Sequence, residues 1–128
     1  MKLRKQYHFW PGEQGLQAWD VHRLIELARG LPVERVPLAD IHEIDSVYWY
    51  DGDFHQPTVR SVIEHARLMR EADLSYPIIL SCTGRVMDGM HRIAKAVLEG
   101  HDAIDAVRFE TDPEPDYVGV APRDLPYD

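Results

Sequence analysis

Apolar residues recur at helical spacing in three separate stretches of the chain. The first stretch covers residues 18–29 and is followed by Gly30, a residue that commonly ends helices. The second covers residues 58–72. The third covers residues 90–98 and is followed by Gly100. The spacing therefore predicts three amphipathic helices.

Short runs rich in β-branched residues lie between these helices and predict strands. The predicted strands cover residues 33–38, 78–80, 85–87 and 104–109. Gly84 separates the two middle runs, which favours a hairpin, and Pro37 places the first strand at a sheet edge or marks its end. At 128 residues, the chain is the size of one domain that combines helices and strands.

The two ends of the chain lack a clear period. Residues 1–15 look irregular, although their aromatic side chains are apolar enough to dock on the body. Residues 111–128 hold four of the nine prolines, and five carboxylates against one arginine. This composition predicts an acidic C-terminal arm, solvated or partly disordered, beside a domain over 1–110. In the alternative interpretation, Tyr117 and Val118 pack on a partner.

The segment 40–56 mixes polar and aromatic residues and predicts a long loop or a bent strand and loop. Its aromatic triplet 48–50 could stack on a base or line a pocket, and ordinary core and lid roles are also consistent with it. His42 and His55 flank Asp51 and Asp53 without a metal-binding spacing, so we predict no metal site in the protein itself.

Charge and cysteine content narrow the function classes. The net charge is −8, which opposes binding to nucleic-acid phosphates, so strong DNA binding is not expected. Cys82 is the only cysteine, which excludes an internal disulfide and favours a cytoplasmic setting. No apolar stretch is long enough to cross a bilayer, so no membrane association is expected.

Candidate chemistry is concentrated where the strand over 85–87 passes into the helix over 90–98. The connecting residues are Asp88, Gly89, Met90, His91 and Arg92. The first amides of a helix lack partners and carry part of the helix dipole, so this junction can hold a phosphate. Gly89 permits close approach, and the two cationic side chains add donors. In the alternative, Asp88 is simply the helix cap.

The sequence VMDGMHRIAKAVLEG resembles the signature of the ParB/sulfiredoxin superfamily. The likeness extends over residues 35–109, through VPLADI, the helix over 58–72 and the strand PIIL, although only the motif over 88–92 is sharp. The resemblance implies a small α+β fold, a mixed sheet with flanking helices, whose core covers about residues 33–110. It also implies that the Gly-x-His-Arg helix start binds nucleotide phosphates.

Members of this superfamily differ in chemistry, and the residues separate them. Sulfiredoxins carry a cysteine where this chain has Met90, and partition proteins carry an Arg-Arg variant of the motif together with a DNA-binding domain. The ADP-dependent free-serine kinases resemble the motif best. Those kinases use a glutamate after the opening strand as a base, and Glu43 occupies a comparable place although its neighbours do not match.

The resemblance therefore implies a nucleotide-binding protein that uses ATP, ADP or CTP with Mg²⁺. Glu43 and His91 are the expected catalytic residues, and residues 88–92 are the expected phosphate-binding set. Asp51 and Asp53 could assist the Mg²⁺. The reaction would be phosphoryl transfer to a small substrate or nucleotide hydrolysis. A nucleotide-sensing or DNA-associated module without chemistry is the alternative, and a homodimer is left open.

Overall fold

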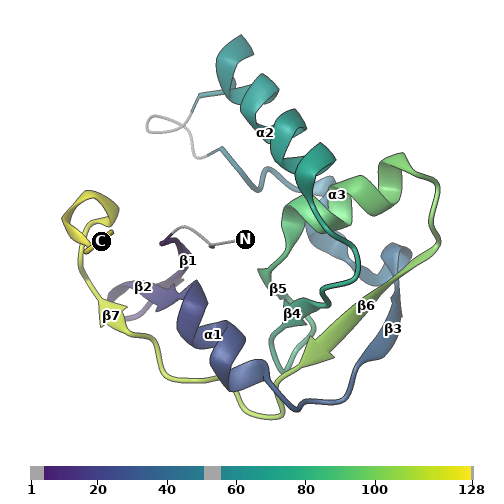
Figure 1. Cartoon of the computed structure of the whole chain (residues 1–128). Helices are drawn as coiled ribbons and strands as arrows, with labels where there is room; N and C mark the ends of the chain where they lie inside the picture. The colour runs from purple at the N-terminus through teal and green to yellow at the C-terminus, as the bar shows by residue number, and fades with distance from the viewer. Residues whose placement is uncertain (1–4, 51–55, 128) are drawn as a thin grey trace.

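The computed structural model describes residues 5–50 and 56–127, which contain three α-helices and two β-sheets (Figure 1). The elements in chain order are β1 (Tyr7–Gly12), β2 (Gly15–Asp20), α1 (Val21–Ala28), β3 (Glu34–Pro37), α2 (Val59–Glu71), β4 (Ile78–Leu80), β5 (Val86–Asp88), α3 (Met90–Leu98), β6 (Ala103–Arg108) and β7 (Tyr117–Val118). The predicted α+β content is confirmed. Within the described residues, no helix is both long and apolar enough to cross a membrane.

The larger sheet has the strand order β3-β6-β4-β5. β4 runs parallel to β6 and antiparallel to β5, which confirms the predicted hairpin, and β3 runs antiparallel to β6. The three residues of β4 are all buried because this strand is covered on both faces, and its apolar run Ile78–Leu80 reflects that position. Pro37 lies on the edge strand β3, as its missing N–H predicted.

Alternate residues of these strands build two hydrophobic cores on opposite faces of the sheet. On one face, Ile78 and Leu80 pack with Ile93 of α3. On the other face, Ile79 packs with Trp19 and Leu24, from β2 and α1. The period-two alternation of each strand therefore fixes α3 on one side of the sheet and the N-terminal part of the chain on the other.

The N-terminal segment differs from the prediction. The helix expected over 18–29 begins at Val21, because residues 15–20 form β2, which pairs with β1 in a hairpin that turns between Gly12 and Gly15. The side chain of Asp20 accepts a hydrogen bond from the His22 N–H and caps α1. Residues 18–20 are therefore strand and cap rather than helix, and the segment expected to be irregular contains β1.

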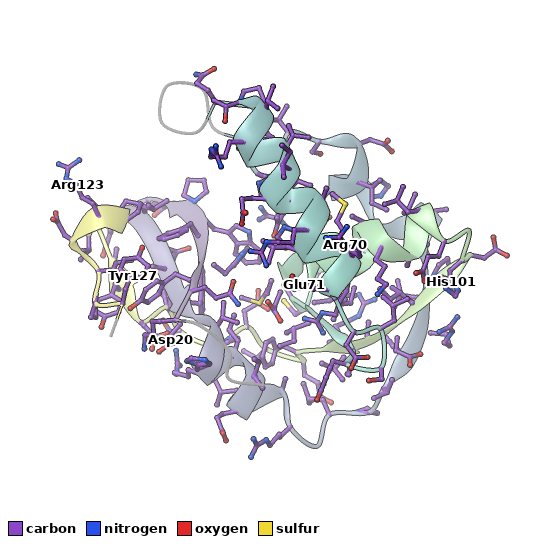
Figure 2. The ribbon with its side chains drawn as sticks, turned by 45° about the horizontal axis from the view of Figure 1, so that its top comes forward. Asp20, Arg70, Glu71, His101, Arg123 and Tyr127 are labelled. Atoms are coloured by element: carbon purple, nitrogen blue, oxygen red, sulfur yellow. The ribbon has the colours of Figure 1, made fainter. Side chains whose placement is uncertain are left out.

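The C-terminal segment is docked on this hairpin, although most of its side chains are exposed or only partly buried. β7 pairs with β2 of the same chain, and Val118 remains 44% exposed. The Trp19 indole N–H donates to the Pro113 carbonyl at 2.8 Å, and Leu125 is buried. Figure 2 shows the labelled Arg123 and Tyr127 beside the small sheet β1-β2-β7.

Helix α2 has nearly the bounds that the sequence predicted, with the Thr58 side chain as its cap. None of its residues is buried, and the apolar positions Val59, Val62 and Ile63 are 78%, 51% and 59% exposed. Figure 1 shows α2 projecting beyond α3, away from the small sheet. The helix is held at its C-terminal end, where Lys95 Nζ of α3 donates to two of its last carbonyls at 2.7 and 3.1 Å.

Candidate functional site

The start of α3 is a bare helix N-terminus that follows directly from β5. Gly89 is the cap residue, with φ of 115°, and no side chain among the described residues caps the helix. A Cβ at this position would lie 2.6 Å from Ile78 Cγ2, so glycine is required both by its backbone conformation and by close packing on β4. The first amides of α3 have no helical acceptor and can bind an anionic group.

Arg92 is tied into the framework beneath this helix start. Its Nη1 donates to the carbonyls of Tyr76 and Pro77 at 2.9 and 2.8 Å, and its Nη2 lies 2.7 Å from Asp88 Oδ2. Asp88 is therefore the partner of Arg92 and not the helix cap. These bonds use three of the five N–H groups of the guanidinium, which leaves two that can reach another acceptor.

Met90 and His91, the remaining predicted phosphate-binding residues, have different surroundings. The Met90 side chain is buried in the core, so only its backbone can face a ligand. His91 Nε2 lies 2.8 Å from Nδ1 of His65, a residue of α2. The indole of Trp49 stacks over both imidazoles, with centroids 4.7 Å from His91 and 4.3 Å from His65. We call these three residues the histidine–tryptophan cluster.

The loop after β3 carries Glu43 and Trp49 to this side of the molecule. Glu43 Oε2 accepts a hydrogen bond from the Val86 N–H at 2.7 Å, at the first residue of β5. Further along, the Tyr50 hydroxyl lies 3.1 Å from Ser61 Oγ on α2. The loop thus contacts β5 through Glu43, α3 through Trp49, and α2 through Trp49 and Tyr50.

The Tyr48 phenol is near enough to Glu43 and to Asp88 for both carboxylates to affect its pKa. Burial raises the pKa of its phenol to about 12, and the negative charges of Glu43 and Asp88 add to this shift, while Arg85 opposes it. The phenol therefore stays protonated at neutral pH and can act as a hydrogen-bond donor.

A groove of about 600 Å³ opens beside Glu43, between β3, the turn that follows it and the β4–β5 hairpin. Arg85 and Arg108 line it together with His42 and Asp40. The Arg85 guanidinium lies 4.1 Å from the Trp10 ring centre and has no ion pair within the part of the chain that the structure describes. The groove is therefore lined by two arginines and by Glu43, with the Arg108 guanidinium paired with Glu34 at 3.2 Å.

The other predicted residues contribute less. Asp45 is exposed. Asp51, Asp53 and His55 lie outside the described residues. Among the residues 5–50 and 56–127, no group of three or more His, Cys, Asp or Glu side chains is arranged to hold a metal ion.

The sequence interpretation missed the contact between His65 and His91. Their separation of 26 positions matches no known ligand spacing, and His65 looked like a surface residue of its helix. The only available signal was the conjunction of a histidine in each of two predicted helices with an aromatic triplet in the long loop.

Comparison of the chain with protein-family models, with curated proteins and with solved structures found no match.

Proposed function

We propose that the protein binds the phosphate groups of a nucleotide at the start of α3, in the manner of ParB/sulfiredoxin-like domains. The observation that carries the proposal is the helix N-terminus at Gly89. Among the described residues, no side chain forms a capping hydrogen bond with the first amides of α3. Helix amides in this arrangement favour an anion both as donors and through the helix dipole.

The side chains around the helix start support the same ligand. Arg92 keeps two N–H groups for a phosphate oxygen while its other bonds hold the helix start in place. The indole of Trp49 offers an aromatic surface next to His91, and a nucleotide base can stack on such a surface. Glu43, which lines the groove, supplies carboxylate oxygens of the kind that Mg²⁺ prefers, and the ion would neutralise the phosphates.

A chemical step would fall to Glu43. Its Oε2 is held by the Val86 N–H, which fixes the carboxylate beside the groove. As a base, this carboxylate would take the proton of an attacking hydroxyl or water. The protein is then a phosphotransferase for a small alcohol or a nucleotide hydrolase. Without such a step, it is a nucleotide-sensing module.

Thermal unfolding with ATP, ADP or CTP and Mg²⁺ tests the proposal. A ligand at 100 times its dissociation constant stabilises the native state by about 2.7 kcal/mol, which gives a clear rise in melting temperature. Each variant is compared with its own ligand-free form. We expect Arg92→Ala to lose most of the shift and Arg67→Ala, an arginine of α2 paired with Glu64 and Glu71, to keep it.

The absence of a shift with all three nucleotides would contradict the proposal. An equal shift in wild type and Arg92→Ala would place the nucleotide elsewhere. Product analysis with serine, other small alcohols or water then distinguishes the enzyme from the sensing module.

A further inference from the structure

The contact between His65 and His91 brings two strong metal-ligand atoms together. His65 Nδ1 comes from the middle of α2 and His91 Nε2 from the first turn of α3, and the two atoms are 2.8 Å apart. The planes of the two rings are inclined by 20°. Neutral imidazole is the commonest ligand for zinc and related divalent ions in proteins.

The separation of the two nitrogens is close to that of a chelating pair. Two nitrogens that each lie about 2.0–2.1 Å from one metal ion are about 2.9 Å apart at a right angle and about 3.4 Å apart at the tetrahedral angle. The observed 2.8 Å is shorter than either value, so metal binding requires the rings to move apart and to turn until both lone pairs face the ion. His65 is carried by α2, none of whose residues is buried.

Trp49 gives the pair a fixed orientation. Its indole is inclined by 15° to His65 and by 13° to His91, so one flat surface covers the same side of both rings. Stacking limits rotation of the imidazoles and shields the nitrogens from water on that side. An ion held by both nitrogens would keep its other positions for water or an anion.

We propose that His65 and His91 together bind one divalent transition-metal ion of the class that imidazole prefers, such as zinc or nickel, beneath the indole of Trp49. This inference uses the histidine–tryptophan cluster and does not depend on nucleotide binding. A plain hydrogen bond between the two histidines is the competing explanation, and it predicts no response to metal ions.

Calorimetric titration of the chelator-treated protein with zinc chloride at pH 7.5 tests the proposal. The Cys82→Ser background is used, because Cys82 is exposed and a thiol can take zinc by itself. We expect one ion per chain, with affinity at least tenfold lower in both His65→Asn and His91→Asn. His101→Asn is the matched control, because His101 lies beside Glu99 after α3 and should leave affinity unchanged.

A second measurement uses unaltered histidines. Because the imidazoles must be neutral to bind metal, zinc affinity should fall steeply as the pH is lowered from 7.5 to 5.5. Far-UV circular dichroism checks that each variant is folded. The proposal is overturned if zinc does not bind at about 100 μM, or if His65→Asn binds it within twofold of the parent protein. Loss of metal binding with intact nucleotide binding would leave the proposed function unaffected.

Discussion

Arg92 Nη2 lies 2.7 Å from Asp88 Oδ2, and both side chains are largely withdrawn from solvent, at 15% and 17% exposure. The pair joins the last residue of β5 to the first turn of α3. The same guanidinium donates to the carbonyls of Tyr76 and Pro77, just before β4. One side chain therefore connects β4, β5 and α3 at the point where a phosphate would be held.

Arg92→Ala should destabilise the protein as well as weaken ligand binding. It removes the donors to two carbonyls and leaves the Asp88 carboxylate unpaired, so we expect the free energy of unfolding to fall by about 3 kcal/mol. Urea denaturation measures this change. Arg67→Ala is the matched control, because its two carboxylate partners are exposed and such pairs contribute less than about 1 kcal/mol. Equal losses in the two variants would show that Arg92 has no connecting role.

Gly89→Ala should be more damaging than the same change at another left-handed glycine. Its Cβ would lie 2.6 Å from Ile78 Cγ2, in addition to the cost of a positive φ. At Gly100 the φ is 79° and a Cβ would meet nothing within 4 Å, so that variant should lose only about 1 kcal/mol. We expect Gly89→Ala to lose at least about twice as much in urea denaturation. Similar losses at both positions would mean that the backbone at Gly89 can move aside.

His8 should make stability depend on pH. Burial lowers the pKa of this histidine from 6.5 to about 4, with a further contribution from Arg85. Because the folded pKa is the lower one, the unfolded chain binds the extra proton between pH 6.5 and pH 4. The stability that neutral His8 contributes is complete above pH 6.5 and is lost as the pH falls toward 4, by about 3 kcal/mol in total.

Urea denaturation at several pH values between 7.5 and 4 measures this loss. The variant His8→Leu removes the titrating ring and its buried Nε2, for which the described residues offer no hydrogen-bond partner. The difference between wild type and variant isolates His8 from the carboxylates that also titrate in this range. Parallel stability curves for the two proteins would contradict the prediction.

Glu43→Gln should keep the loop in place while removing the proton acceptor. The amide oxygen can still accept from the Val86 N–H, so the unfolding free energy should change by less than about 1 kcal/mol. If Glu43 is the base, nucleotide affinity stays the same and turnover falls by about 10²–10⁴-fold. Steady-state kinetics and calorimetry measure the two effects.

Glu43→Ala serves as the structural comparison, because it leaves the Val86 N–H without its acceptor and should cost about 1–3 kcal/mol. Full turnover in Glu43→Gln would exclude Glu43 as the base. Absence of turnover in the wild type, with nucleotide bound, would favour the sensing module.

The elements that the sequence predicted well are those whose apolar residues all pack in the core of the larger sheet. The apolar run of β4 and the helical stripe of α3 pack on each other in the core, so local pattern and tertiary environment agree. Gly89 and the strand-to-helix junction were predictable for the same reason. At the N-terminus, Ala18 belongs to a strand and Val21 to a helix. Their spacing happens to fit a helical period, so the sequence predicted one helix across both. Asp20, a good cap residue, was the signal that separates them.

The contacts that escaped prediction join segments far apart in the chain. Packing of α2 on α3 decides that His65 faces His91, and the course of the loop decides that Trp49 covers them. The bonds of Arg92 to two backbone carbonyls depend on where the chain enters β4, which no side-chain pattern encodes. For α2, the sequence predicted the helix correctly, but its apolar residues are exposed to solvent. The side of α2 that faces the protein carries Ser61 and His65, which contact the loop and α3.

The small sheet β1-β2-β7 also has a consequence for the order of folding. The hydrogen bond between Trp19 of β2 and Pro113, in the segment that leads to β7, joins residues 94 positions apart. During synthesis the hairpin of β1 and β2 leaves the ribosome long before β7 exists, so Trp19 lacks its carbonyl partner until the tail is made. Contacts of such long range form late and slowly. The apolar surface of the N-terminal hairpin that the tail covers therefore stays open to aggregation until the tail has been synthesised.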